Sequence, residues 1–310
     1  MTTLLITLPI FAYIFIGWLA AKSRYVSDKV CDGLSEYVFS IAVPVLIMMT
    51  LAQTSSEDPI IPTYWVSYFG ACAIAWGITM LLTKKLLKRP HKETVICGYA
   101  TSQANTVFMG IPLILDVYGQ AGSVPLFMLL AIHLPIMLGA ASFLIELGGS
   151  EKFFTKLKRI VLTICTNPIF VALIIGSFLH YFAIKPQGTI KTILESIAGT
   201  ASTCALISLG MALNRYRIKD DLKCASIIVV GKLIIHPLAV WVLAFYVFEL
   251  PPVYAGVAVL FATLPVGVNA YLLSFYYKTA ERPVSSAVLI STVLSVFSVS
   301  IWLSLLLKMQ

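Results

Sequence analysis

Charged residues are scarce in this chain of 310 residues. They make up 12% of the sequence, whereas hydrophobic residues make up 59%, and the mean hydropathy is +0.92. Soluble domains carry about 25% charged residues, so this composition excludes an ordinary soluble domain. The alternating pattern of barrel strands is also absent, and backbone groups in lipid must be hydrogen-bonded internally. We therefore expect an all-α integral membrane protein.

Motifs for catalysis, metal binding and nucleic-acid binding are missing as well. The six cysteines form no Cys-x-x-Cys pair, which argues against a zinc site or a disulfide framework. There is no Gly-x-x-x-x-Gly-Lys-Ser/Thr loop for ATP hydrolysis and no His-Glu-x-x-His motif for a metalloprotease. The net charge of +8 is spread over short loops, so no nucleic-acid partner is expected. These absences predict a protein that is not an enzyme and that has no cofactor or metal.

Apolar stretches long enough to cross a bilayer occur ten times. The hydrocarbon core is about 30 Å thick, and a helix needs about 20 residues to cross it. The stretches run over residues 4–21, 37–56, 59–83, 94–115, 117–145, 160–184, 196–214, 225–248, 250–277 and 284–307. We predict ten transmembrane helices.

The Lys and Arg residues lie almost entirely in loops on one side of these helices. Loops on that side carry 18 of the 22 Lys and Arg residues, and loops on the other side carry 2. The positive loops are residues 21–29, 84–92, 148–159, 214–223 and 278–283. Because short loops rich in Lys and Arg stay in the cytoplasm, the pattern predicts that both termini lie outside.

The chain divides into two halves of five expected helices each. The longest polar connection, residues 148–159, is a cytoplasmic loop between the first half, 1–147, and the second half, 160–310. Because five is an odd number, a repeated five-helix unit must insert upside down the second time. Inverted repeats of this kind are common in secondary transporters, in which the substrate binds near the membrane midplane between the repeats.

The fourth and ninth expected helices each combine Asn, Gly and Pro near the middle of the span. Pro removes a backbone donor and Gly weakens a helix, so both helices are expected to be broken there and to cross each other. Broken ends expose amides and carbonyls to a cavity, where they can bind ions or polar solutes. Single kinks of this composition are common, but two at matching positions of the two halves point to a transport site. The residues are Asn105, Gly110 and Pro112 in the fourth helix and Pro265, Gly267 and Asn269 in the ninth.

These segments resemble the auxin efflux carrier family, its bacterial members in particular. Residues 105–113 and 264–273 are similar to the family's fourth and ninth helix motifs, and residues 208–213 and 232–237 to other recurrent segments. The resemblance implies a ten-helix inverted-repeat secondary transporter of the bacterial inner membrane, with a scaffold and a moving, elevator-like transport domain. It implies that organic anions, either auxin-like or dicarboxylates such as malate and malonate, bind where the broken helices cross. One departure is Ala104, because plant members carry proline in both broken helices.

The candidate substrate-binding residues are those of the expected crossover together with one intramembrane lysine. Half-helix N-termini carry partial positive charge, and Asn side chains can donate hydrogen bonds to a carboxylate. The alternative for each Asn is ordinary hydrogen bonding between helices. The set comprises Asn105, Thr106, Gly110, Pro265, Gly267, Asn269 and Lys232.

Lys232 lies inside the eighth expected helix, with His236 one turn later on the same side. A charge near the bilayer centre costs at least about 2.5–3.5 kcal/mol on insertion scales, so it needs a partner or a cavity. Lys232 either attracts a substrate carboxylate or is a structural cation paired with an acid or with helix carbonyls. The candidates for proton or ion coupling are His236, His133, Asp116 and Glu36, and the last two are also candidate partners of Lys232. For the two histidines the alternative is packing in the helix core.

The leading hypothesis is a secondary carrier of small organic anions that works by alternating access across the plasma membrane. The alternative is a sodium-coupled symporter or channel of similar inverted-repeat build, since Thr101, Ser102, Thr106 and Thr263 supply hydroxyl oxygens beside the expected breaks. The expected partners are a small organic anion, the lipid bilayer and, because static anchors often dimerise, a second copy of the chain.

Overall fold

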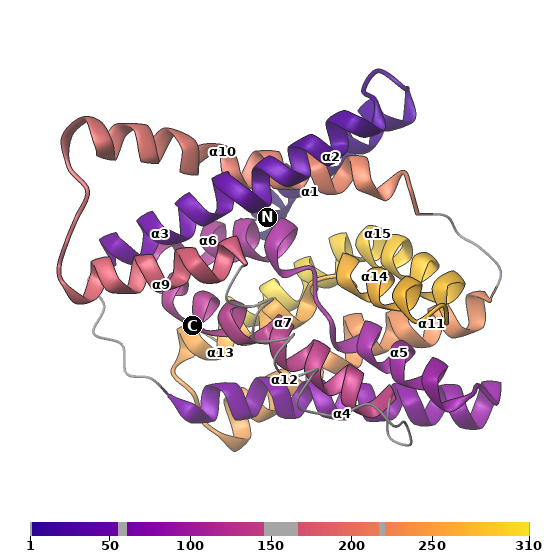
Figure 1. The fold of residues 1–310 in the computed structure, drawn as a ribbon. Helices are drawn as coiled ribbons and strands as arrows, with labels where there is room; N and C mark the ends of the chain where they lie inside the picture. The colour runs from indigo at the N-terminus through magenta and orange to yellow at the C-terminus, as the bar shows by residue number, and fades with distance from the viewer. Residues whose placement is uncertain (1, 55–60, 146–166, 217–220, 310) are drawn as a thin grey trace.

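Helices make up the architecture of the described residues (Figure 1). The computed structural model describes residues 2–54, 61–145, 167–216 and 221–309. The α-helices are α1 (Thr2–Lys22), α2 (Asp28–Tyr37), α3 (Val43–Gln53), α4 (Pro62–Leu87), α5 (His91–Ser102), α6 (Ile111–Tyr118), α7 (Ser123–Ile145), α9 (Pro168–Tyr181), α10 (Gly188–Leu213), α11 (Leu222–Val230), α12 (His236–Val242), α13 (Pro252–Thr263), α14 (Val268–Tyr276) and α15 (Glu281–Leu306). Short π-helical or 3-10 segments connect several of them: η1 (Val38–Ala42), η2 (Thr106–Gly110), η3 (Gly119–Gly122), η4 (Gly231–Ile235) and η5 (Leu243–Val247). The expectation of an all-α membrane protein agrees with this arrangement.

Within the described ranges, 6 helical stretches are long and apolar enough to cross a membrane. The sixth expected helix starts at residue 160, so its first part lies outside the described residues. The fourth and ninth expected helices are each divided into two shorter helices. The number of ten crossings therefore stays a prediction. The long stretches are Asp28–Gln53, Pro62–Leu87, Thr106–Ile145, Gly188–Leu213, Leu222–Val247 and Glu281–Leu306.

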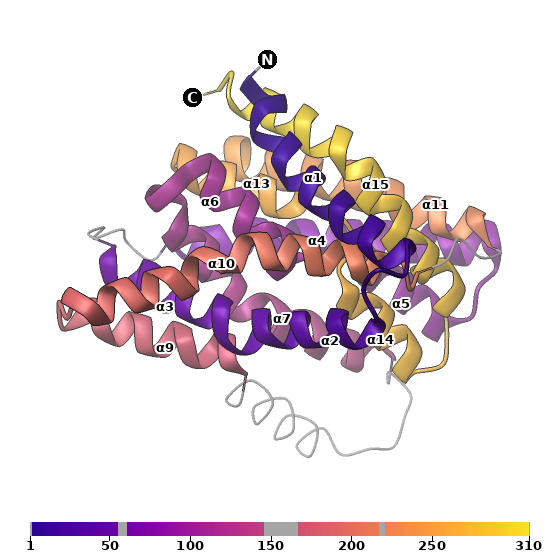
Figure 2. The same cartoon turned by 90° about the horizontal axis from the view of Figure 1, so that it is seen from above.

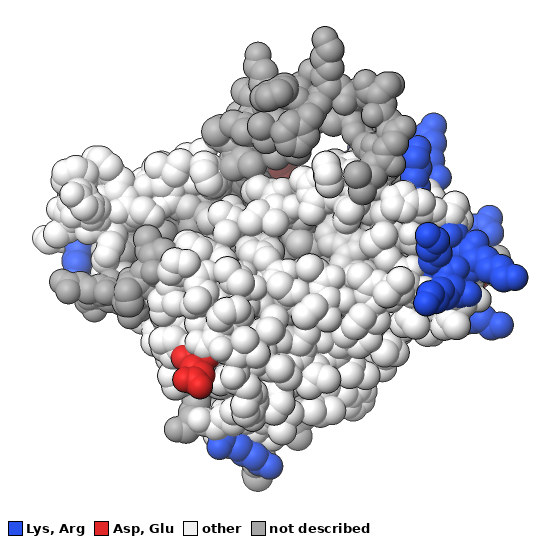
Figure 3. All heavy atoms as spheres, turned by 90° about the horizontal axis from the view of Figure 1, so that it is seen from below, with Lys and Arg blue, Asp and Glu red and all other residues white. Residues whose placement is uncertain are grey.

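A broad uncharged surface covers one side of the molecule, with Lys and Arg at its margins (Figure 3). α4 and α12 lie along this lower side in Figure 1, and Val66, Leu81 and Leu238 are among their exposed apolar side chains. Soluble monomers rarely expose apolar patches this extensive. Contact with lipid accounts for the surface.

The helices pack in two groups. α1 packs most extensively on α10, and α3 on α9, so these helices and α2 form one group. The other group contains α4 to α7 and α11 to α15, with close pairs such as α4 with α5 and α11 with α15. In Figure 1 the first group lies along the upper side and α4 and α12 along the lower side; Figure 2 shows α10, α3 and α9 side by side. The crossover segments and the candidate site lie where the two groups meet.

α1 and α10 touch backbone to backbone. Both Gly17 and Gly210 are buried in this contact, and a Cβ atom at Gly210 would overlap the carbonyl oxygen of Ile14. A Cβ atom at Gly17 would likewise overlap the carbonyl oxygen of Ile207. Small residues allow such close approach of membrane helices, whose association depends on van der Waals packing.

Replacing Gly210 by Val should destabilise the protein, because the new side chain must push α1 away from α10. We expect a loss on the order of 1–3 kcal/mol in the free energy of unfolding, measured as a lower Tm in detergent. Gly199→Val is the matched control, since it lies on the same helix and a Cβ atom there has no neighbour within 4 Å. Equal Tm values for the two variants would contradict the close contact of α1 with α10.

Candidate substrate site

Two interrupted helices meet through their backbones. α5 ends at Ser102 and α13 ends at Thr263, and each is followed by a few extended residues. The amide of Asn105 donates to the carbonyl of Pro265 at 3.0 Å, and the amide of Gly267 donates to the carbonyl of Gln103 at 2.9 Å. These bonds make an antiparallel bridge between the two breaks. The expected crossing of the fourth and ninth helices is therefore present in this structure.

The second break follows from its proline and glycine. The residue before a proline avoids the α region, and Leu264 is extended, with ψ 149°. Gly267 is required by the close approach of the other chain segment, because a Cβ atom there would lie 2.6 Å from the carbonyl oxygen of Ala104. A serine hydroxyl on α15 helps hold the segment, since Ser291 Oγ accepts from the amide of Val266 at 3.0 Å.

The first break forms without a proline. Gln103 and Asn105 leave the helical region, with ψ 114° and 72°, and the bridge to the other segment satisfies their backbone groups. Gly110 lies further along, inside η2, where it leaves room for the side chain of Leu264. The role of Gly110 is thus to pack the crossover rather than to break the helix, and Pro112 sits in the first turn of α6.

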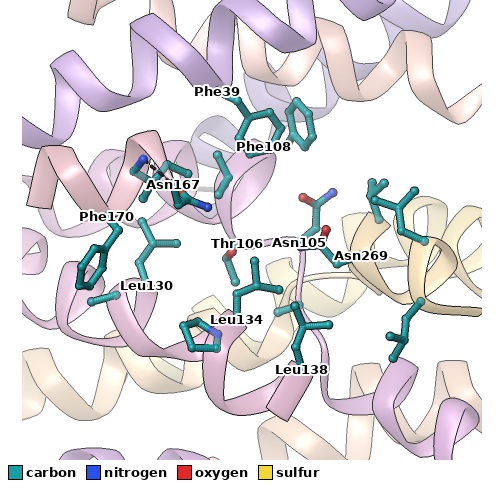
Figure 4. A pocket seen from close by; sticks show the side chains of 18 of the residues that line it. Phe39, Asn105, Thr106, Phe108, Leu130, Leu134, Leu138, Asn167, Phe170 and Asn269 are labelled. Carbon is teal, nitrogen blue, oxygen red and sulfur yellow. Dashed lines mark hydrogen bonds between the residues drawn. The ribbon is translucent and has the colours of Figure 1, made fainter. Parts of the chain in front are cut away.

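A pocket of about 510 Å³ opens beside the crossover (Figure 4). Its walls come from both helix groups, and no charged side chain of the described residues lines it. The polar lining consists of Asn105, Thr106, Ser142, Asn167, Asn269, Tyr276 and Tyr277. The remaining lining is Phe39, Ala104, Val107, Phe108, Leu130, Ala131, Leu134, Pro135, Leu138, Ile169, Phe170, Leu173, Val268, Leu272 and Leu273.

Two helix N-termini face this pocket without a capping side chain. The helix formed by η2 and α6 begins after Asn105, whose side chain makes no capping hydrogen bond. Helix α14 begins after Gly267, which has no side chain to cap it. Thr106 and Val268, the first residues of these helices, line the pocket. Asn105 is 5% exposed and its side chain has no hydrogen-bond partner among the described residues. This end of the pocket is rich in free donors, which suits an anion.

Comparison with known proteins agrees with this architecture. The family described as membrane transport protein matches residues 4–303. The chain belongs to this family. A "Putative malonate transporter" of Rhizobium meliloti (strain 1021) is 24% identical over 95% of this chain and 93% of that protein. An "Uncharacterized transporter" of Methanothermobacter thermautotrophicus is 22% identical, with 95% of each chain covered.

Family membership confirms the resemblance to the auxin efflux carriers. The protein is a membrane transporter and not an enzyme, and it is a multi-pass protein of the bacterial inner membrane. The comparisons extend over nearly the whole chain, so the crossover segments lie within the matched region. Family membership alone does not identify the substrate of this transporter or the residues that bind it.

Lys232 lies behind the crossover of this transporter and does not line the pocket. Its side chain is 0% exposed, and its Nζ donates to the carbonyl oxygen of Ala262 at 3.0 Å. His236 Nδ1 is also 3.0 Å from Nζ, and His236 Nε2 is 3.2 Å from the Sγ of Cys72. Ala262 belongs to the last turn of α13, whose carbonyls lack helical partners. The lysine therefore supports the end of a broken helix.

One of the other candidate coupling residues, His133, lies in the same buried cluster as His236, because the ring of Tyr68 contacts both histidine rings. His133 is buried between the rings of Tyr68 and Phe261, at centroid distances of 5.6 and 5.4 Å. Neither of its ring nitrogens has a partner in the described part of the chain. Asp116 and Glu36 are exposed, and neither is bonded to Lys232. The structure brings Lys232 close to His236, and no acidic side chain of the described residues is bonded to it.

Several pocket residues carry no signal that sequence reasoning could use. Phe39 lies in η1 of the first helix group, and Phe170 lies on α9. Both belong to stretches that are apolar on all sides. Their sequence therefore does not distinguish residues that line the pocket from residues that face lipid. Asn167 does carry a signal, because Asn before Pro is typical of a helix start. Its side chain accepts from the amide of Ile169 at 2.9 Å and so caps α9.

Gly267→Ala should disrupt the crossover, because its methyl group would collide with the backbone at Ala104. We expect a loss on the order of 1–3 kcal/mol in the free energy of unfolding, seen as a lower Tm of the purified protein. Gly139→Ala on α7 is the control, because a Cβ atom there meets nothing within 4 Å. If both variants melt with the wild type, the close pairing of the two breaks is wrong.

Proposed function

We propose that this transporter is a secondary carrier of small organic anions, with the substrate bound at the crossover of its fourth and ninth helices. The observation that carries the proposal is the buried, unpartnered side chain of Asn105 beside two uncapped helix N-termini. Asn269 lies next to Asn105 in Figure 4 and lines the same end of the pocket. These groups can donate several hydrogen bonds to one carboxylate.

The proposed mechanism is alternating access between the two helix groups. α1, α2, α3, α9 and α10 would form the static scaffold, and the other helices would move with the crossover. The pairing of α1 with α10 and of α9 with α3 supports two inverted repeats, 1–147 and 160–310, because each pair joins the first expected helix of one half to the second expected helix of the other half. α1 packs on α15 and the two termini lie near each other in Figure 2, which supports a common side for both.

The pocket extends toward the side of the Lys- and Arg-rich loops. Tyr277 directly precedes the positive loop 278–283, and Asn167 follows the connecting loop 148–159. If these loops are cytoplasmic, the structure represents a carrier open to the cytoplasm. On the opposite side, Gln120 Nε2 donates to Thr54 Oγ1 at 2.8 Å, a bond that joins the two helix groups.

The alternative is a sodium-coupled symporter or channel, and the surroundings of the crossover favour it less. The described residues hold no cluster of three acidic, His or Cys side chains that could bind a metal ion. Thr101 Oγ1 is bonded to Thr79 Oγ1, and the hydroxyls of Ser102 and Thr263 donate to backbone carbonyls. Flux that depends on Na⁺ at constant pH would support this alternative.

Replacing Asn105 or Asn269 by Ala should lower anion flux into proteoliposomes by about tenfold or more. A hydrogen bond to a charged group contributes about 1.5–3 kcal/mol, and each substitution removes such a donor. Asn214→Ala is the matched control, because Asn214 is the exposed C-cap of α10 and lies outside the pocket. Unchanged flux in both pocket variants, with normal Tm, would refute the proposed site.

Lys232→Met should act on stability rather than on substrate affinity. Met has a similar length but leaves the Ala262 carbonyl without its donor, which costs about 1–3 kcal/mol for a buried group. We expect a lower Tm and an affinity for the anion within about threefold of the wild type, measured by titration in detergent. A tenfold weaker affinity at unchanged Tm would instead assign Lys232 to substrate binding.

A further inference from the structure

We infer that the substrate carries one carboxylate on an apolar body, and that small dicarboxylates such as malonate are poor ligands of this pocket. The inference rests on the proposed function, because it takes the crossover pocket as the anion site. It concerns a choice that the family leaves open for this chain. Three features of the pocket carry it: the amount of positive charge, the state of a third helix N-terminus and the apolar walls.

The positive charge available at the crossover matches one carboxylate. Each helix N-terminus is equivalent to about +0.5 elementary charge, and two uncapped N-termini, at Thr106 and Val268, meet there. No Lys, Arg or His among the described residues lines the pocket. The buried Nζ of Lys232 donates to the carbonyl of Ala262 instead. The described lining can therefore balance one negative charge and offers no charged group for a second.

The third N-terminus at the pocket is already occupied. Helix α9 begins at Pro168, which has no amide hydrogen, and Asn167 caps the amide of Ile169. The amide of Val171 donates to the carbonyl of Asn167 at 3.0 Å. In Figure 4 Asn167 and Phe170 lie on the opposite side of the pocket from Asn105 and Asn269. A second carboxylate reaching this wall would find few free donors.

The remaining walls suit an apolar group. Leu130, Leu134 and Leu138 of α7 line the pocket between its two ends, and Phe39 meets Phe108 edge to face at 4.8 Å. A volume of about 510 Å³ lies in the range of sites that enclose ligands of moderate size. A compact dicarboxylate would leave much of this volume unfilled and would place its second charge against leucine side chains. Burying a charge without a partner is unfavourable.

The test compares hexanoate with two ligands that differ from it by one group, and with malonate. Hexanoate, hexanedioate, neutral hexanamide and malonate are titrated into purified wild-type protein, and dissociation constants are measured by calorimetry. We expect hexanoate to bind at least about tenfold more tightly than hexanedioate, hexanamide and malonate, a difference of about 1.4 kcal/mol. Hexanedioate or malonate binding as tightly as hexanoate would overturn the inference.

A charge added to the opposite wall should change this preference. Phe170→Lys places an ammonium group there, and Phe170→Ala removes the same ring without adding charge. The ratio of hexanedioate to hexanoate affinity should rise about tenfold in Phe170→Lys relative to Phe170→Ala. An unchanged ratio would mean that the distal wall does not face the second carboxylate, which also overturns the inference.

The outcomes separate this inference from the function on which it rests. If malonate binds best and Asn105→Ala abolishes its binding, the pocket is an anion site and the inference about substrate class is wrong. If none of the carboxylates binds to a protein that melts cooperatively, both the inference and the proposed function fail. Selective binding of hexanoate that is lost in Asn105→Ala supports both.

Discussion

The pairing of two backbone breaks is the constraint on which the rest of this structure depends. Within a bilayer, an interrupted helix leaves amides and carbonyls without water to bond them, and each unsatisfied group is costly. Here the bonds from Asn105 to Pro265 and from Gly267 to Gln103 let each break satisfy the other. Neither break could persist alone, so the two halves of the chain must fold together. The absence of a side chain at Gly267 permits the required distance.

This pairing divides the crossover into two chemically different sides. On one side, helices begin, and their free amides meet the pocket near Asn105 and Asn269. On the other side, helices end, and donors from neighbouring helices bond their carbonyls or stand close by, as Lys232 does for Ala262. If the pocket binds an anion as proposed, the buried lysine behind it need not touch that anion. Lys232 instead bonds the end of α13, and α14, which follows the break, begins at the pocket.

The sequence predicts the crossover well and the pocket only in part. Asn105, Thr106 and Asn269 could be predicted as lining residues, because breaks with Asn, Gly and Pro at matching positions of the two halves indicate a transport site. For Lys232 the sequence left a substrate carboxylate, an acid and helix carbonyls as alternative partners, and it could not identify the carbonyl of Ala262, which lies beside the amine together with His236. Phe39 could not be predicted either: in lipid, every face of a helix is apolar, so hydrophobicity does not separate a pocket wall from the membrane surface. The sequence also does not show which residues of the two breaks pair with each other.

The part of the pocket lining that the structure describes carries no charged side chain, which has a consequence for the energetics of the proposed anion transport. If Lys232 moves with the crossover as an ammonium ion, the carrier loaded with a monoanion is neutral and the empty carrier bears one positive charge. If the amine is neutral, the loaded carrier bears one negative charge and the empty carrier none. In both cases one charge crosses per cycle, and the membrane potential contributes about 2.3 kcal/mol per 100 mV. An inside-negative potential then favours exit of the anion, and the protonation of Lys232 decides only which half of the cycle the potential drives.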